Sequence, residues 1–177
     1  MDAGQAFTKA YEEYADALFR HCYFRVSNRE RALELTQETF MKTWDVITQG
    51  KRIENHKAFL FRVLNNLIID EYRKKKSPSL DALLEQEGVT EGNFIDLQTG
   101  SLEEEVEKIE LNLQSERLEK ALKELPESYR SVVMMRFMND LRPKEIASIL
   151  GESENAVSVR INRGVKKLRQ CMATVQV

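Results

Sequence analysis

Six side chains near the C-terminus combine the chemistry that reads duplex DNA. They are Asn155, Val159, Asn162, Arg163, Lys166 and Gln170, and at 100° per residue they share one face of a helix. Amides and an arginine can hydrogen-bond to base edges, while lysines and a further arginine can meet phosphates. The pattern favours a DNA-reading surface over an ordinary helical hairpin with a solvated basic face.

The elements around these residues have the order of a helix-turn-helix. Pro143 suits the first turn of a short helix, and Gly151 follows its last apolar residue, where a left-handed residue ends a helix. Ser153 can then cap a second helix. An apolar stripe on that second helix lies opposite the reading face and consists of Val157, Ile161, Val165 and Leu168.

The charge of the chain is distributed in three blocks. The whole chain has 177 residues, 42% of them hydrophobic, and a net charge of −2. Residues 1–76 carry a net charge of +3, residues 77–112 carry −9 and residues 113–177 carry +4. Two basic blocks that could each lie on nucleic acid therefore flank an acidic segment that DNA would repel, although acidic linkers are also common for solubility.

Other classes of protein are disfavoured. No apolar run approaches the roughly 20 residues of a membrane span and no leader is apparent, so we expect a cytoplasmic protein without membrane insertion. Cys22 and Cys171 are not spaced for a zinc cluster, and His21 beside Cys22 is expected to have a core or surface role rather than a role in metal or nucleophile chemistry. Neither a metal nor a cofactor is expected.

The remaining periodicity is helical, with no strong strand signal and no internal repeat. It predicts helices over 7–25, 29–47 and 57–76, a loop over 48–56, and further helices over 105–125 and 127–138. The helix expected over 57–76 is apolar over a wide arc and should be central to its domain. Proline and glycine punctuate 77–100, where at most a short helix at 81–87 is expected. The predicted fold is all-α: two small helical domains, 1–76 and 113–177, joined by a flexible acidic linker over 77–112.

Four blocks of sequence, in order and at suitable separations, resemble a bacterial sigma factor of the extracytoplasmic-function (ECF) type, in the sigma-70 superfamily. They are ELTQETFMKTW (34–44), AFLFRVLNNLIIDEYR (58–73), LPESYRSVV (125–133) and EIASILGESENAV (145–157). The resemblance implies that residues 1–76 are sigma region 2, which binds core RNA polymerase and the opened minus-ten element. It implies that residues 113–177 are sigma region 4, which reads the minus-thirty-five element.

The resemblance also assigns residues to sites. A pocket for one extruded base is expected over 50–56, and the residues expected to bind the minus-ten strand are Lys51, Arg52, Asn55, Phe59, Arg62, Asn66, Arg73 and Lys74. Packing remains the stronger interpretation for Trp44, Phe59 and Phe61. The residues expected to bind the minus-thirty-five element are Asn155, Ser158, Val159, Asn162, Arg163, Lys166 and Lys167.

Polymerase docking is assigned to Glu34, Gln37 and Glu38, which share a helix face and could pair with partner arginines; a solvated acidic face is the alternative. The expected partners are core polymerase and promoter DNA. In the free protein, the surfaces that face polymerase and DNA would be buried by an anti-sigma factor or by closure of the two modules on each other. The connector could keep the modules apart or let them close.

Three functions are weighed. The first is a non-enzymatic sigma factor that directs promoter recognition and transcription initiation. The second is a stand-alone helix-turn-helix transcription regulator that resembles response-regulator output domains. The third, a helical nuclease, is disfavoured because Asp70, Glu71 and the linker acids form no carboxylate cluster beside a basic pocket.

Overall fold

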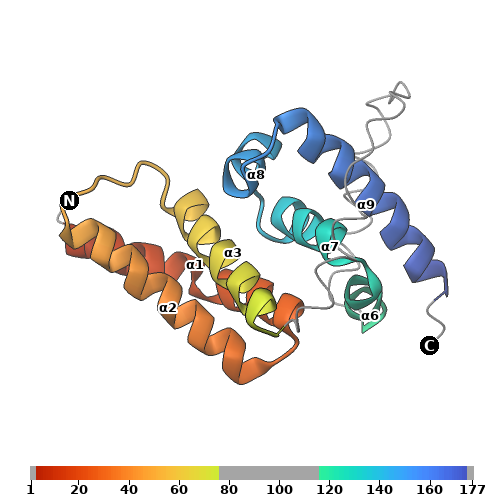
Figure 1. Ribbon diagram of the computed structural model, residues 1–177, viewed down its shortest axis with the longest axis horizontal. Coiled ribbons are helices and arrows are strands. Elements are labelled where there is room, and N and C mark those ends of the chain that lie inside the picture. Colours follow the sequence, from red (N-terminus) through yellow and green to blue (C-terminus); the bar gives the residue numbers. More distant parts are fainter. Residues whose placement is uncertain (1–2, 76–115, 175–177) are drawn as a thin grey trace.

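The computed structural model describes residues 3–75 and 116–174, and every regular element in these two ranges is helical (Figure 1). The elements are α1 (Ala3–Val26), α2 (Arg29–Thr48), α3 (His56–Lys75), α6 (Glu116–Glu124), α7 (Glu127–Val133), the π-helix η2 (Met134–Met138), α8 (Pro143–Leu150) and α9 (Glu154–Thr174). We name α1 to α3 the N-terminal module and α6 to α9 the C-terminal module. The prediction of two all-α regions is confirmed.

Apolar side chains at helical spacing bring the three helices of the N-terminal module together. Leu18 on α1 and Leu60 and Leu64 on α3 are fully buried. Helix α2 adds a buried stripe of threonines, Thr36 and Thr39 among them, whose hydroxyls donate to carbonyl oxygens one turn earlier at 2.7 and 2.8 Å. These hydroxyls are buried with their hydrogen bonds made. Helix α3 packs on both α1 and α2, as predicted for the central helix.

The predicted helix over 127–138 is wrong in its second half. Helix α7 ends at Val133 and the chain continues as the π-helix η2. The backbone N–H of Asn139 donates to the carbonyl of Met134 at 3.0 Å, and that of Leu141 donates to Met135 at 2.9 Å, so the turns are wider than in an α-helix. The helix expected at 81–87 lies outside the described residues, and so does the part over 105–115 of the helix expected over 105–125, whose remainder is α6.

The helix-turn-helix forms as its sequence predicts. Pro143 opens α8, and Gly151 ends it with φ 71° in the left-handed region. The hydroxyl of Ser153 accepts a hydrogen bond from the backbone N–H of Ala156 at 3.2 Å and caps α9. No hydroxyl caps α8; instead the Glu145 carboxylate accepts from the backbone N–H of Arg142 at 2.8 Å, which is half of a capping box.

Helix α9 approaches α7 closely at Gly164. A Cβ atom added there would lie 2.7 Å from Cγ2 of Val133 and 3.5 Å from Cβ of Tyr129. Because Val133 is buried and its branched side chain has little rotamer freedom, a methyl group at position 164 must push the two helices apart.

Gly164→Ala is therefore expected to lower the free energy of unfolding by about 1 kcal/mol, since overpacking outweighs the gain in helix propensity. Val133→Ala removes the clashing methyl, so the double variant should lose less stability than the two single losses together predict. Urea unfolding of the parent, both single variants and the double variant measures this. If the losses are additive, the contact between position 164 and Val133 is not the source of the stability loss in Gly164→Ala.

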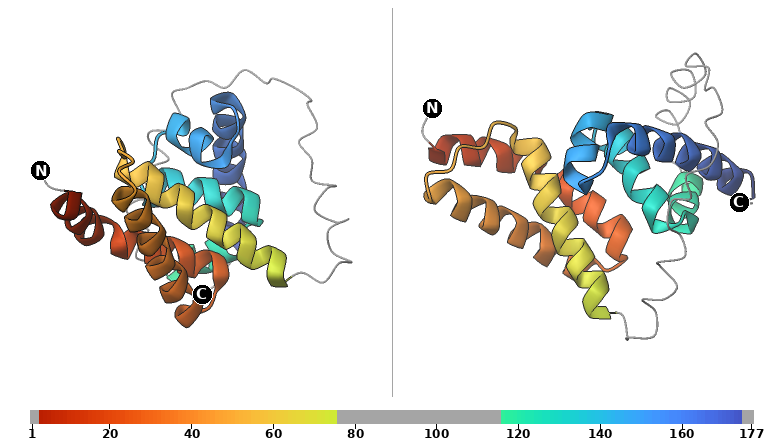
Figure 2. Two further views of the ribbon diagram at one scale, coloured as in Figure 1. Left: turned by 60° about the vertical axis from the view of Figure 1, so that its left-hand side comes forward. Right: turned by 45° about the horizontal axis from the view of Figure 1, so that its top comes forward.

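The two modules pack against each other. Helix α3 contacts α8, and α1 contacts α6, α7 and η2 (Figures 1 and 2). Buried apolar side chains from both modules form one continuous cluster. Of the two arrangements that the connector was expected to allow, the structure has the closed one, so each candidate site must be considered together with its neighbours from the other module.

Candidate DNA and polymerase interfaces

The reading face lies on α9, above a buried stripe. Val157, Ile161, Val165 and Leu168 are all at most 4% exposed and anchor the helix to its module. The predicted reading residues fall on the remaining surface: Asn155, Arg163, Lys166 and Lys167 are exposed, and Ser158, Val159 and Asn162 are half-buried. Seven side chains with DNA-reading chemistry thus share one helix whose orientation is fixed by its packing.

Two members of this set make contacts within the module. The Ser158 hydroxyl donates to the carbonyl oxygen of Glu154 at 2.9 Å. The ammonium group of Lys167 lies 5.3 Å from the ring centroid of Tyr129, a cation–π contact that turns it toward α7. Lys166 is therefore better placed than Lys167 to meet a phosphate beside α9.

A bidentate ion pair joins the turn of the motif to α9, and the sequence analysis missed it. Nη1 and Nη2 of Arg160 donate to the two carboxylate oxygens of Glu152 at 2.9 and 2.6 Å. The residues are eight positions apart and separated by a turn, so helical i, i+4 spacing does not reveal the pair. The pair fixes the turn relative to the reading helix.

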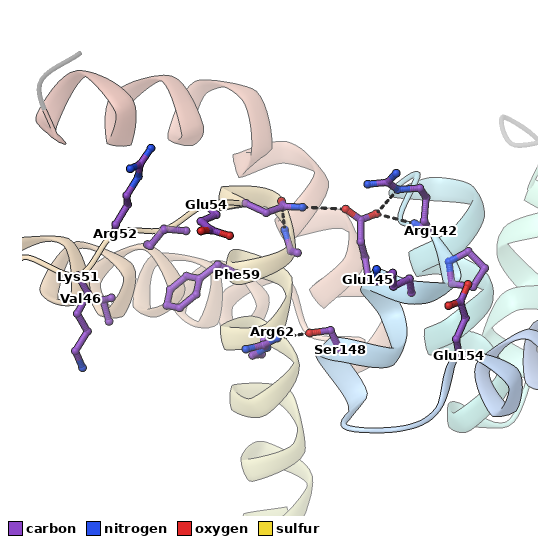
Figure 3. A pocket seen from close by; sticks show the side chains of 15 residues that line it. Val46, Lys51, Arg52, Glu54, Phe59, Arg62, Arg142, Glu145, Ser148 and Glu154 are labelled. Atoms are coloured by element: carbon purple, nitrogen blue, oxygen red, sulfur yellow. Dashed lines mark hydrogen bonds and ion pairs between the residues drawn. The ribbon is translucent and has the colours of Figure 1, made fainter.

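The second site is a cleft of about 1060 Å³ where the loop before α3 meets α8 (Figure 3). Five of the eight residues predicted to bind the minus-ten strand line it: Lys51, Arg52, Asn55, Phe59 and Arg62. Arg142 and Lys144 of the C-terminal module add two cations. Three glutamates partly offset the positive charge, Glu54 from the N-terminal module and Glu145 and Glu154 from the C-terminal module. The cleft combines cations with one aromatic ring, which is the chemistry of a single-strand site.

The other three predicted residues lie away from the cleft. Asn66, Arg73 and Lys74 are exposed farther along α3, toward its C-terminal end, and they do not line the cleft. Arg73 lies 3.7 Å from the Asp70 carboxylate. The structure therefore brings together the N-terminal part of the predicted set and leaves these three apart from it.

Polar groups on the cleft wall contact α8. The Asn55 amide donates to the Glu145 carboxylate at 2.9 Å, and a guanidinium N–H of Arg62 donates to the Ser148 hydroxyl (Figure 3). Burial acts to raise the pKa of Glu145, but hydrogen bonds from Arg142 and Asn55 outweigh it and hold this pKa below its ordinary value. Glu145 is thus kept charged at the boundary between the modules.

The predicted aromatic set divides in two. Phe61 is 1% exposed, so packing is the correct interpretation for it. Phe59 is half-buried and lines the cleft. Trp44 is 40% exposed, yet its ring centroid lies 4.9 Å from that of Phe7, so it caps an aromatic group between α1 and α2. Of the three, only Phe59 lies in the cleft.

The predicted docking face on α2 is solvent-accessible. Gln37 is exposed, and the side chains of Glu34 and Glu38 are 60% and 43% exposed. Each glutamate has a nearby cation on its own helix: Arg31 donates to Glu34 at 2.6 Å, and Lys42 lies 3.6 Å from Glu38. These exposed pairs are weak, so both carboxylates can exchange partners readily.

The structure also contains a buried polar group between the modules that sequence reasoning did not find. His21 and Arg25 on α1 and Asn65 on α3 are at most 6% exposed. His21 contacts Asn139 and Arg25 contacts Glu127, both in the C-terminal module, and Arg25 also donates to Asn65. Of the core and surface roles that were expected for His21 and Cys22, the structure has the core role for both. The partner of His21 across the interface is far away in the sequence, and only the tertiary packing reveals it.

Within 3–75 and 116–174, no three His, Cys, Asp or Glu side chains are grouped so that they could hold a metal ion. Among the helices of these ranges, none is sufficiently long and apolar to cross a membrane.

Comparison with known proteins relates both modules to one family. Residues 10–77 match the family described as sigma-70 region 2, and residues 115–168 match the one described as sigma-70, region 4. The chain is 30% identical over 167 residues to the ECF RNA polymerase sigma factor SigW of Bacillus subtilis, which covers 93% of this chain and 88% of the relative. It is 28% identical over 164 residues to the ECF RNA polymerase sigma factor SigL of Mycobacterium tuberculosis, with 90% and 84% covered.

A solved structure shares the fold. It is the sigma factor RpoE of Bartonella quintana in a co-crystal with the anti-sigma factor NepR, with a TM-score of 0.68 and 21% identity, covering 97% of this chain and 99% of that chain. The two region matches lie in the order of the two helical modules, and the SigW likeness spans nearly the whole chain. The chain is therefore a member of the ECF group of RNA polymerase sigma factors.

Proposed function

We propose that this sigma factor binds bacterial core RNA polymerase through α2, holds the opened minus-ten strand at the cleft, and reads the minus-thirty-five duplex with α9. Residues 1–76 would then act as region 2, residues 77–112 as an acidic connector and residues 113–177 as region 4. The protein would work in the cytoplasm without catalysing a reaction, and an anti-sigma factor is a further proposed partner.

The observation that carries this proposal is the reading face of α9. Its amide, guanidinium and ammonium groups lie opposite a stripe that is at most 4% exposed, on a helix that is capped at its start and preceded by a left-handed glycine. A helix held in this way presents a fixed set of donors to a major groove. No such role is open to a helix that packs on all sides.

The cleft supports the minus-ten role by its chemistry. An extruded base needs an aromatic or apolar surface, and the strand on either side needs cations that follow its phosphates. Phe59 supplies the first, while Lys51, Arg52 and Arg62 supply the second. Asn55 adds an amide that can hydrogen-bond to a base edge, and its side-chain oxygen already caps α3 through the N–H of Ala58 at 2.9 Å.

The α2 face supports polymerase docking because its acids are exposed and close together. Glu38→Lys reverses one charge and is expected to weaken the complex with core polymerase at least about tenfold, as truncating a paired interface charge typically does. Co-elution and titration with bacterial core polymerase test the assignment, with circular dichroism to confirm folding. Glu13→Lys, an exposed change on α1, is the matched control. Unaltered binding by folded Glu38→Lys would show that this face does not dock.

A stand-alone regulator remains the rival function, and no finding favours it. It would need the C-terminal module to bind duplex DNA and act without polymerase.

A further inference from the structure

In the closed arrangement, α8 occupies the polar groups that are assigned above to the minus-ten strand. Asn55 donates to Glu145, and Arg62 donates to the hydroxyl of Ser148 (Figure 3). Between them along the chain, Nζ of Lys57 donates to the carbonyl oxygen of Asp140 at 3.2 Å. A strand lying on α3 needs the same donors, because phosphates and base edges offer the same acceptors as carboxylate, hydroxyl and carbonyl oxygens. DNA and residues 140–148 of the C-terminal module cannot both hold these donors.

A second set of contacts, away from the cleft, fastens the modules together. Arg25 is buried, donates to the Asn65 side chain at 2.8 Å within its own module, and forms an ion pair with Glu127 on α7. Arg130 on α7 reaches back across the interface and donates to the carbonyl oxygen of Phe24 at 3.2 Å. A buried arginine paired in this way loses its partner if the modules separate, so these contacts favour closure.

His21 completes this second set. Its Nδ1 lies 3.0 Å from the Asn139 side-chain oxygen, and its Nε2 lies 3.4 Å from Nη1 of Arg25. Because Nε2 faces a cationic donor, it accepts, and the neutral ring donates from Nδ1 to Asn139. We name the pairs Arg25–Glu127, His21–Asn139 and Arg130–Phe24 the latch.

Two of the three proposed functional surfaces are outside the closed interface. The reading helix α9 packs on α6, α7 and α8, all in its own module, and Arg163 and Lys166 on it are exposed. Helix α2 packs on α1 and α3, and Glu34 and Gln37 on it are exposed. Closure therefore masks the cleft selectively.

We propose that the closed arrangement is an autoinhibited state, in which α8 and a single DNA strand compete for the N-terminal part of α3 while the latch favours α8. Polymerase docking through α2 and duplex reading through α9 can then precede opening, and the strand site is uncovered last. This inference rests on the minus-ten role proposed above for the cleft. It predicts that the free protein binds single strands weakly because only its open fraction is competent.

The latch can be weakened without altering any residue assigned to DNA or polymerase. In the full chain, Glu127→Gln with Asn139→Ala removes the ion pair and the histidine bond, and the parent is the reference. Anisotropy with a mixed-sequence single-stranded DNA is expected to show about tenfold tighter binding, since apparent affinity rises with the open fraction. Binding to a mixed-sequence duplex should stay within about twofold, and X-ray scattering should show a larger radius of gyration.

Glu124→Gln is the matched control because it removes one exposed carboxylate from the adjoining helix α6 and should change neither DNA affinity nor scattering. Glu127→Gln alone serves if the double variant fails to fold. The inference is overturned if scattering shows opening while the parent and the variant bind the strand with equal, measurable affinity, or if neither quantity changes in a folded variant. If the latch variant opens but neither protein binds strands, the proposed strand-binding role of the cleft fails and closure by the latch stands.

Discussion

Replacing Arg163 with alanine is expected to weaken binding to the minus-thirty-five duplex by about 1–3 kcal/mol and to relax the sequence preference at one base pair of that element. Arg163 is exposed and lies within about 25° of the direction opposite the buried stripe, taking 100° per residue. It should therefore project farthest into a major groove, where a bidentate arginine to guanine is the commonest specific contact. Transcription from a promoter library with randomised upstream elements measures both effects.

Lys166→Ala is the matched comparison on the same helix. Lys166 is exposed one turn farther on, where the helix leaves the groove, and unlike Lys167 it makes no cation–π contact with Tyr129. Loss of the Lys166 ammonium group should weaken binding to all promoters about equally. It should also reduce the slope of log affinity against log salt concentration by about one. A uniform loss in the Arg163→Ala variant, with upstream preference unchanged, would instead assign Arg163 to the DNA backbone.

Mild acid is expected to destabilise the closed protein through His21. Burial, followed by the nearby Arg25 charge, lowers the pKa of His21 from 6.5 to about 3. The contribution of His21 to the free energy of unfolding is therefore fully present above pH 6.5 and is lost as the pH falls from 6.5 toward 3. The reason is that the unfolded chain takes up a proton that the native chain excludes. From pH 6.5 to 5.5 the loss approaches about 1 kcal/mol in the free energy of unfolding.

Urea unfolding at several pH values, with scattering at the same pH values, measures this effect. The carboxylates whose pKa values are lowered, Glu71 and Glu145, stay largely ionised above pH 5.5 in both states, so they add little in this window. His21→Gln should flatten the slope between pH 6.5 and 5.5, whereas His56→Gln should leave it in place. An equal slope in the parent and the His21→Gln variant would exclude His21 as its source.

The helix-turn-helix was predictable because its signals are local. Pro143, Gly151 and Ser153 each act within one turn of their own position, and the stripe of α9 follows from spacing alone. The two-module all-α fold was predictable for the same reason, since each long helix carries its own amphipathic pattern. Resemblance to a family supplied the roles of the individual residues, which spacing could not.

The closed interface was not predictable in its residues. His21 and Asn139 are 118 positions apart and Arg25 and Glu127 are 102 apart, so no periodicity connects them. The π-helix η2, which leads into Asn139, has no marker among its five residues, three of which are buried. The minus-ten set was predictable only in part because α3 exposes cations both at Arg62 and at its C-terminal end, and only packing shows which of them line a cleft.

The central claim is that this chain gives bacterial core RNA polymerase its choice of promoter. Run-off transcription by core polymerase with and without the full-length protein, on a library that varies both promoter elements, tests it most directly. We predict discrete transcripts that require the protein and that share one minus-ten and one minus-thirty-five sequence at a constant spacing. Duplex binding without polymerase, together with no protein-dependent transcript from any member of the library, would contradict the claim and favour a stand-alone regulator.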